Sequence, residues 1–282
     1  MKILVTGGLG FVGSTLVDRL VKSGNEVTVV DNLSSASSSE EYRNTSVNYI
    51  IEDIKNIKDS DFSEHFEVIY HLAGLARIQP SFEDPLSYIE VNVLGTAIIC
   101  ELAKKHNAKL IYSSSSSINN GEFKTPYTFS KWGGEAVLET WRECYNLDAS
   151  ICRFYNVYGP REPKTGDYAT VIRKFIRQYQ HNESLTIVGD GNQRRDFTHV
   201  NDIVEGLIQV ASNDENGMFH LGRGVNYSIN ELASMFEYEN IIYIPLRKGE
   251  GLVTLADYEK TFHILGWKAK YNLEDYIKKI IR

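Results

Sequence analysis

The chain has 282 residues, a formal net charge of −7 and the composition of an ordinary globular protein. This acidic balance gives no reason to expect nucleic acid or an anionic membrane as a partner, and we identify no apolar run near the ~18 residues of a membrane span. The length suffices for one large α/β domain, or for one such domain plus a smaller lobe.

The chain opens with a short apolar run that leads directly into a glycine-rich turn. Residues 2–6 include β-branched side chains and are long enough for one buried strand. Gly7, Gly10 and Gly13 follow, and a helical pattern begins at Phe11. A turn in this position lets the backbone approach a diphosphate, while the helix N-terminus supplies N–H groups and partial positive charge. The order predicts a dinucleotide-binding turn; the alternative is a purely structural turn.

An acidic residue follows at the spacing that dinucleotide binding requires. Asp31 ends the next apolar run, residues 27–30, about 20 residues after the turn. Its carboxylate can accept hydrogen bonds from a ribose hydroxyl and would repel a 2′-phosphate, which favours NAD over NADP. Residues 32–40 are rich in serine and predict a loop whose first residues lie beside the ribose.

Strand and helix patterns then alternate along the chain. Further strands are predicted at residues 47–51, 68–71, 109–112 and 149–154, and helices at 11–23, 86–106 and 127–146. Such alternation implies an α/β fold with a doubly wound parallel Rossmann sheet. Ligands of these sheets bind at the carboxyl ends of the strands.

The pattern changes after Gly159, where Pro160, Pro163 and Gly166 interrupt it. We predict a cofactor domain at residues 1–159 and a smaller C-terminal substrate-binding lobe at 160–282. The elements predicted in this second part are a basic helix at 170–180, a strand at 185–188, a loop at 189–197 and a helix at 203–211. We expect residues 200–212 to return to the larger domain.

Tyr127 and Lys131 lie four residues apart at the start of a predicted helix, so they share one face. A phenol is a poor base because its pKa is about 10, but a nearby ammonium stabilises the phenolate and lowers that pKa. The pair could take a proton from a substrate hydroxyl while hydride leaves the same carbon, and Lys131 could also hold a nicotinamide ribose. The spacing is common by chance, but its position downstream of the glycine turn favours the functional interpretation.

Five serines, residues 113–117, follow Tyr112 at the predicted end of the fifth strand. One hydroxyl there could bind the reacting oxygen beside Tyr127, whereas most of the five must belong to a polar loop. The three cysteines, Cys100, Cys144 and Cys152, lack metal-site spacing. We interpret them as buried thiols of a cytoplasmic protein without metal or disulfides. A first strand at the N-terminus also predicts no signal peptide.

Longer motifs then suggest a family. They are TGGLGFVGS (6–14), VDNLSS (30–35), HLAG (71–74), NVLGT (92–96), SSSSS (113–117), PYTFSK (126–131), RFYNVYGPR (153–161), GDGNQRRDF (189–197) and LGW (265–267). Their order resembles that of the extended short-chain dehydrogenase/reductases. The sequence is most similar to NAD-dependent nucleotide-sugar epimerases of the UDP-glucose 4-epimerase type, and the resemblance covers nearly the whole chain.

The resemblance implies a role for individual residues. Those implied to bind NAD are Gly7, Gly10, Phe11, Val12, Gly13, Asp31, Asn32, Asp53, Ile54, Leu72, Ala73, Gly74, Tyr127 and Lys131. Within the serine run the implied catalytic hydroxyl is Ser115, acting with Tyr127 and Lys131. Asn156, Arg195 and Arg247 are implied to hold the substrate diphosphate, as suits guanidinium forks. The alternatives are a structural turn for Asn156 and surface ion pairs for the arginines.

The chain departs from the family pattern near the sugar. The segment between Ser115 and Tyr127 has about half the usual length, and Asn119-Asn120 replaces the usual Tyr-Gly. Family dehydratases place an Asp-Glu pair after the fifth strand and decarboxylases place a Glu, whereas this chain offers only hydroxyls. We therefore predict epimerisation at C4 of a UDP-sugar through a transient ketone. The alternatives are a reductase or dehydratase of the same family, or a dinucleotide sensor without chemistry.

Two finer expectations follow from the resemblance. Where some members have a bulky aromatic that restricts the pocket to plain hexoses, the aligned residue is Thr254, so we expect room for a 2-N-acetyl group. In the family, the helices matching residues 86–106 and 127–146 pair across a dimer. Their apolar residues here predict a homodimer, the alternative being that both helices only cover the sheet.

Overall fold

The computed structural model describes residues 1–35, 40–164, 166 and 168–282, so most of the predicted serine-rich loop lies outside the described residues. Its centre is a seven-stranded sheet in the order β11-β6-β5-β4-β1-β2-β3, with every pairing parallel. The strands are β1 (Lys2–Thr6), β2 (Glu26–Asp31), β3 (Asn48–Ile51), β4 (Val68–His71), β5 (Lys109–Ser115), β6 (Ala149–Phe154) and β11 (Met218–Leu221). This confirms the doubly wound fold, whose strand order reverses direction between β1 and β4.

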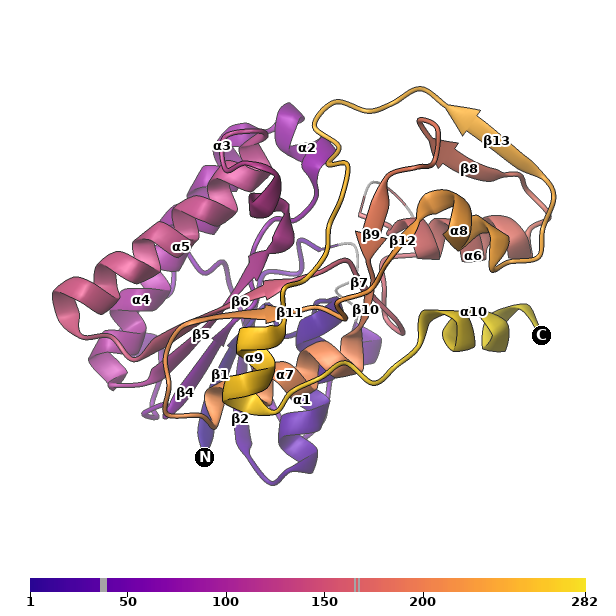
Figure 1. The fold of residues 1–282 in the computed structure, drawn as a ribbon. Coiled ribbons are helices and arrows are strands. Elements are labelled where there is room, and N and C mark those ends of the chain that lie inside the picture. Colours follow the sequence, from indigo (N-terminus) through magenta and orange to yellow (C-terminus); the bar gives the residue numbers. More distant parts are fainter. Residues whose placement is uncertain (36–39, 165, 167) are drawn as a thin grey trace.

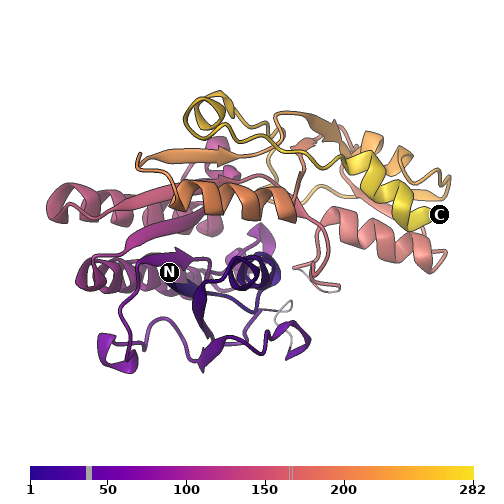
Figure 2. The same ribbon diagram turned by 90° about the horizontal axis from the view of Figure 1, so that it is seen from below.

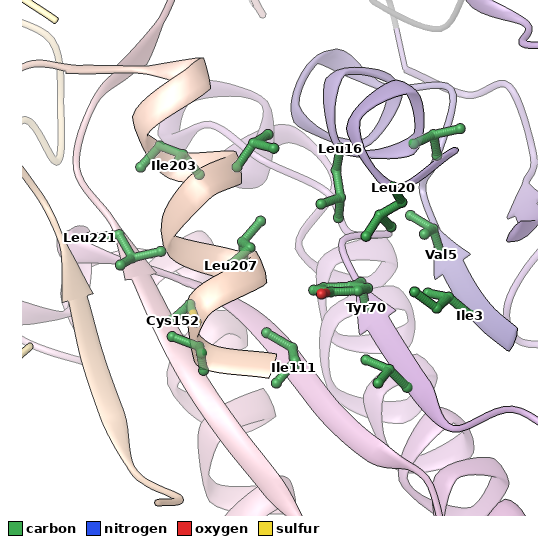
Figure 3. Close-up of a cluster of buried hydrophobic side chains, with 14 of the residues drawn as sticks. Ile3, Val5, Leu16, Leu20, Tyr70, Ile111, Cys152, Ile203, Leu207 and Leu221 are labelled. Carbon is green, nitrogen blue, oxygen red and sulfur yellow. The ribbon is translucent and has the colours of Figure 1, made fainter. Parts of the chain in front are cut away.

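Helices α1 (Phe11–Lys22) and α7 (Val200–Ala211) lie side by side on one face of the sheet. Figure 3 shows their buried contacts with the strands: Leu16 and Leu20 of α1 lie beside the strand residues, as do Ile203 and Leu207 of α7. The strand side chains in this cluster include Ile3, Val5, Tyr70, Ile111 and Cys152. Burying each large apolar side chain contributes about 1.5–3 kcal/mol, so this contact fixes α7 on the sheet.

The opposite face is covered by α4 (Gly95–His106) and α5 (Pro126–Tyr145), which also pack on each other (Figure 1). Leu4 of β1 points to this face because side chains alternate along a strand. Helix α5 begins at Pro126 because the Thr125 hydroxyl accepts a hydrogen bond from the Thr128 amide and proline suits the first helical position.

Helix α4 continues a longer helical stretch through α3 (Pro85–Ile89) and a π-helical turn at Glu90–Leu94. By length and composition the whole stretch, Pro85–His106, is apolar enough to cross a membrane. The expectation that no segment reaches this threshold was therefore wrong. In the structure Ile99 and Leu102 of this helix lie in the core against the sheet, so packing within the fold accounts for its apolar character.

A smaller lobe is built from short elements. Strands β8 (Leu185–Val188) and β13 (Ile241–Ile244) pair in parallel, while β9 (Arg194–Asp196) and β12 (Asn226–Ser228) pair antiparallel. Helices α6 (Val171–Gln180), α8 (Ile229–Ser234) and α10 (Leu273–Ile281) pack on them around Phe175, Ile187 and Phe236. The prediction of a loop at 189–197 was thus wrong for β9. The strand that pairs with β9 lies about 30 residues further along the chain, so the local sequence does not reveal the pairing.

The second part of the chain contributes to both bodies. Figures 1 and 2 show the N-terminus at the large sheet and the C-terminus in the smaller lobe. Between them α7, β11 and α9 (Glu259–Leu265) join the sheet layer, and the buried Trp267 indole donates to the Asp202 carbonyl at 3.1 Å. A two-stranded pairing of β7 (Val157–Tyr158) with β10 (Thr198–His199) lies where the chain passes between the two bodies.

The cysteines agree only in part with their prediction. Cys100 and Cys152 are buried free thiols, whereas Cys144 is exposed. The expectation of three buried thiols was wrong for Cys144, because this residue lies in the last turn of α5 and faces away from the sheet.

Candidate active site

The carboxyl ends of the central strands open into a cavity of about 730 Å³ between the sheet and the lobe, a size typical of ligand sites. Every residue predicted for the site lines it. These residues are Gly7, Gly10, Phe11, Val12, Gly13, Asp31, Asn32, Asp53, Ile54, Leu72, Ala73, Gly74, Ser115, Tyr127, Lys131, Asn156, Arg195, Arg247 and Thr254. Segments from the first strand to the last third of the chain therefore meet at one place.

The glycine turn is shaped by close backbone contacts. Gly7 has a φ of +71°, and a Cβ there would lie 2.6 Å from the Ala73 amide nitrogen. A Cβ on Gly13 would lie 2.0 Å from the Gly7 carbonyl oxygen. Both positions exclude any larger residue. Gly10 is the N-cap of α1 and has no side chain to cover the helix end, so the first turn faces the cavity and suits an anionic diphosphate.

The acidic residue at the end of β2 is held in place by the turn itself. One Asp31 carboxylate oxygen accepts from the Leu9 amide at 2.9 Å and the other from the Leu33 amide at 2.8 Å. Beside it, the Asn32 amide donates to Asp53 at 3.2 Å. Two carboxylates at this end of the cavity suit ribose hydroxyls and disfavour a phosphate, so the residues present fit NAD better than NADP.

The wall formed by residues 72–77 is fastened by Asn92. Its side-chain oxygen accepts from the Leu75 amide at 2.8 Å, and its nitrogen donates to the Leu75 carbonyl and to the Ser130 hydroxyl, both at 2.9 Å. Asn92 lies in the π-helical turn, and such turns occur frequently at functional sites. Sequence analysis included it in the NVLGT motif (92–96) but assigned it no role, because its burial depends on the fold.

A buried hydrogen-bonded chain lies beneath this wall. The Thr6 hydroxyl is 2.8 Å from His71 Nδ1, and His71 Nε2 is 3.1 Å from the Thr96 hydroxyl, which in turn donates to the Asn92 carbonyl. Thr96 therefore accepts from Nε2–H, and Thr6 donates to Nδ1. Burial lowers the His71 pKa to about 3, so the ring is neutral and fixes the ends of β1 and β4 to the long helix.

Tyr127 and Lys131 project from the first two turns of α5 into the cavity. The Lys131 ammonium donates to the Ser113 carbonyl at 2.9 Å and lies 5.1 Å from the centre of the Tyr112 ring. Burial lowers the Lys131 pKa to about 8, an effect that Glu135 opposes. Lys131 therefore remains mainly protonated at neutral pH.

The Tyr127 pKa is raised above its usual value by burial, while a hydrogen bond with Ser115 and the positive charge of Arg77 act to lower it. The expectation that Lys131 brings this pKa below 10 was therefore wrong for the protein in this structure, because burial outweighs the neighbouring groups. Arg77 is a site residue that sequence reasoning missed. Nothing in the local pattern distinguishes it from a surface arginine.

The structure distinguishes the five serines. Ser113 donates to the His71 carbonyl at 3.0 Å, and Ser114 donates to Glu135 at 2.5 Å, whereas Ser115 meets Tyr127. Glu135 also accepts from Nε and one terminal nitrogen of the Arg153 guanidinium, at 2.8 and 2.6 Å. Both oxygens of this carboxylate close to the serines thus accept hydrogen bonds from the protein.

The lobe side of the cavity is assembled from side chains that also hold one another. Asn156 donates to the Asp196 carbonyl at 3.0 Å and to the Thr254 hydroxyl at 2.8 Å. Its side chain therefore has a structural role, since it joins these two segments. Arg195 is largely buried and forms an ion pair with Glu250 at 3.4 Å. Arg247 lines the cavity from the segment after β13. Within the described ranges, no group of three or more His, Cys, Asp or Glu side chains is placed to hold a metal ion.

Comparison with known proteins identifies the family. Residues 3–222 match the model of the NAD dependent epimerase/dehydratase family. The chain belongs to this family. NAD, which the glycine turn and Asp31 fit, is its cofactor, and similar solved structures contain NAD.

Similar proteins match this chain along nearly its whole length. A candidate UDP-glucose 4-epimerase from Methanocaldococcus jannaschii is 34% identical over 99% of this chain and 97% of its own. UDP-glucuronic acid decarboxylase 2 from Arabidopsis thaliana is 31% identical over 100% of this chain and 68% of its own. The crystal structure of UDP-glucose 4-epimerase with UDP-glucose from Thermotoga maritima has a TM-score of 0.94 and 32% identity, covering 100% of this chain and 97% of the other. We conclude that the chain is an enzyme of the NAD dependent epimerase/dehydratase family and that UDP-sugar epimerases are among its similar proteins.

Proposed function

We propose that this protein catalyses epimerisation at C4 of a UDP-hexose. The observation that carries the proposal is the contact of Ser115 with Tyr127 at the cofactor end of the cavity, with Lys131 one turn further along α5. UDP-glucose 4-epimerases are among the relatives of this chain, which supports the same reaction.

NAD supplies a reversible acceptor for the hydride that leaves the sugar carbon. Tyr127 takes the proton of the C4 hydroxyl at its phenol oxygen, and it returns that proton when the ketone is reduced from the other face. The Ser115 hydroxyl holds the same substrate oxygen beside Tyr127. Lys131, charged below about pH 8, would hold the nicotinamide ribose of the cofactor, while the Ser115 hydrogen bond and the Arg77 charge favour the phenolate form of Tyr127.

A carboxyl group for dehydration or decarboxylation is the feature that would favour the other family reactions. At the end of β5 the residues are hydroxyls, and the adjacent Glu135 is occupied by Ser114 and Arg153. Relatives include UDP-glucuronic acid decarboxylases, so a decarboxylase is the second candidate. A dinucleotide sensor would have no need of Ser115, Tyr127 and Lys131 converging on one point.

The lobe residues suit the nucleotide and the sugar. Arg195, Arg247 and the exposed side of Asn156 would hold the diphosphate, because guanidinium groups match phosphate oxygens in geometry and charge. Thr254 lines the same cavity with a short side chain, and this supports acceptance of 2-N-acetylated sugars as well as plain hexoses.

We further propose a homodimer formed through the outer faces of α3 to α5. Leu86 and Leu94 are 74% and 53% exposed there, and Phe123 is 72% exposed just before α5. Apolar side chains of this size gain by burial against a second copy. Sedimentation of the wild type and of Leu94→Lys tests this: a dimer that becomes a monomer supports the interface, and a wild-type monomer contradicts it.

Proton NMR of the purified protein tests the reaction with UDP-galactose, UDP-N-acetylgalactosamine, UDP-galacturonate and dTDP-glucose in separate samples without reductant. A C4 epimer from any of the first three establishes epimerisation and identifies the sugar. A 4-keto-6-deoxy product from dTDP-glucose identifies a dehydratase, and a pentose product from UDP-galacturonate identifies a decarboxylase. Either of these outcomes contradicts the proposal.

A further inference from the structure

The short turn that follows β5 begins at the candidate catalytic hydroxyl. Ser115 is the N-cap of a 3₁₀ turn at Ser116–Asn120, and its side-chain oxygen accepts from the Ser117 amide at 3.2 Å. In this turn the sequence departs from the family pattern, because Asn119-Asn120 replaces the usual Tyr-Gly. The direction in which the Ser115 hydroxyl points therefore depends on the contacts that hold this turn.

A buried ion pair lies beside the turn. Arg153 of β6 is the register partner of Ser114 in β5, and its Nε and one terminal nitrogen donate to Glu135 of α5 at 2.8 and 2.6 Å. Glu135 is only 4% exposed and also accepts from the Ser114 hydroxyl at 2.5 Å. The ion pair thus joins two neighbouring strands to the helix that carries Tyr127.

Asn119 binds the remaining nitrogen of the same guanidinium. The second terminal nitrogen of Arg153 donates to Asn119 Oδ1 at 2.8 Å, and Asn119 Nδ2 donates to the Tyr155 hydroxyl at 2.9 Å. The Tyr155 hydroxyl keeps its own proton, which it donates to Nδ1 of His220 at 2.7 Å. Both polar atoms of the Asn119 amide therefore have partners on β6.

These contacts hold the chain on both sides of Ser115. Ser114, which precedes it, reaches the guanidinium through Glu135, while Asn119, at the other end of the turn, binds the guanidinium directly. Glu135 lies two helical turns after Tyr127 on α5, so the same ion pair sets the distance between the serine turn and the tyrosine. Displacing a reacting group by about 1 Å can cost about 10²-fold in rate.

We propose that Asn119 is a positioning residue, whose contact with Arg153 holds the turn so that the Ser115 hydroxyl faces the reacting oxygen beside Tyr127. The proposal rests on the C4 epimerisation proposed above. Asn119 itself does not line the cavity, so it acts through Ser115. It is also exposed, unlike the ion pair, so replacing it leaves the buried charges paired.

The test measures kcat and KM for C4 epimerisation of UDP-galactose, or of UDP-N-acetylgalactosamine or UDP-galacturonate if the wild type epimerises one of those. Asn119→Leu keeps nearly the same volume and removes both hydrogen bonds. We expect kcat to fall about 30-fold, with KM changed by less than about threefold. Asn119→Asp keeps an oxygen for Arg153 and should recover most of the loss.

A double-mutant cycle with Ser115→Ala separates positioning from a general structural role. Ser115→Ala alone should lower kcat by about 10²-fold, as loss of a hydrogen-bond donor to a reacting oxygen does. Asn119→Leu should then lower kcat by less than about threefold further, because the hydroxyl that it positions is gone. A structural role independent of Ser115 would give the same 30-fold loss in both backgrounds.

The matched control is Asn240→Leu, at an exposed position in the lobe where the amide oxygen accepts from the Ser184 hydroxyl at 2.7 Å. It should leave kcat unchanged. An unchanged kcat for Asn119→Leu, equal losses in both backgrounds, or loss of NAD binding in Asn119→Leu would overturn the positioning role and leave C4 epimerisation standing. Wild-type protein that binds NAD but epimerises none of the three sugars overturns both proposals.

Discussion

The two ends of the cavity are built in different ways. The end of the cavity at the glycine turn, which we call the cofactor end, is formed by short chain segments whose backbones lie close together. An added Cβ would lie 2.6 Å from a backbone atom at Gly7 and 2.0 Å from one at Gly13, so neither position accepts a larger residue. The sugar end is assembled from side chains spread between Arg77 and Thr254, which hold one another by hydrogen bonds and an ion pair. Where backbone atoms lie this close, only glycine fits, whereas a residue that makes side-chain contacts can be replaced by one that makes other contacts. The fold can therefore keep its cofactor while its sugar changes.

The largest effect is expected where the two ends meet, at Tyr127. Tyr127→Phe removes the phenol oxygen that exchanges the substrate proton, and kcat should fall by about 10³-fold or more. NAD binding, followed by fluorescence, should persist because the cofactor end is unchanged. Tyr145→Phe on the exposed end of the same helix is the control. A Tyr127→Phe variant with wild-type turnover would favour a protein without this chemistry.

At the cofactor end, Gly13→Ala tests the claim that backbone contacts set the residue type. The new Cβ would overlap the Gly7 carbonyl oxygen at 2.0 Å, so the free energy of unfolding should fall by about 3 kcal/mol and NAD should bind less tightly. Gly217→Ala is the control, since its Cβ would meet nothing closer than the Lys260 ammonium at 4.0 Å. Equal denaturation midpoints for both variants would contradict the claim that backbone contacts determine the residue type at position 13.

Acid should lower the free energy of unfolding through protonation of His71, which lies beneath the cofactor end of the cavity. Burial lowers the His71 pKa to about 3 in the folded protein, whereas an unperturbed histidine has a pKa of about 6.5, so the unfolded chain takes up the proton first. The stabilisation is complete above about pH 6.5 and is lost as the pH falls towards 3, by about 2 kcal/mol at pH 5.

Guanidinium denaturation at pH 7 and pH 5 measures this loss. His71→Asn should reduce the difference between the two pH values, whereas His263→Gln, at an exposed position in α9, should leave it unchanged. If His71→Asn shows the full wild-type difference, then other groups cause the acid sensitivity.

The smallest effect is expected at the sugar end, where the protein should tolerate substitution of Thr254. Thr254→Tyr narrows the space beside the sugar and should reduce kcat/KM for UDP-N-acetylgalactosamine about tenfold relative to UDP-galactose. Thr254→Val keeps the volume but loses the hydroxyl that accepts from Asn156 and from the Asp196 amide. It therefore separates lost hydrogen bonds from added bulk. Equal effects of Thr254→Tyr on both sugars would remove Thr254 from sugar selection.

The sequence was most informative where structure depends on neighbours along the chain. The apolar runs at residues 2–6 and 27–30 predicted β1 and β2, because a buried strand needs a continuous apolar stretch. The glycine turn predicted the cofactor site, because only glycine permits its close contacts. Position in the serine run, read through the family resemblance, also identified Ser115, which the structure places beside Tyr127.

Other features depended on contacts between distant residues. The pairing of β9 with β12, the addition of β11 to the sheet and the π-helical turn around Asn92 have no local pattern that specifies them. The raised pKa of Tyr127 arises from burial, which the spacing of Tyr127 and Lys131 does not reveal.

The sequence by itself thus determined strands β1 to β6, the cofactor turn and the pairing of Tyr127 with Lys131, since each follows from local geometry and periodicity. The tertiary structure alone decided which charged groups lie near the catalytic residues. It placed Arg77 beside Tyr127 and occupied Glu135 with Ser114 and Arg153. The physical reason is that electrostatic interactions act through space, between groups that the folded chain brings together from distant segments.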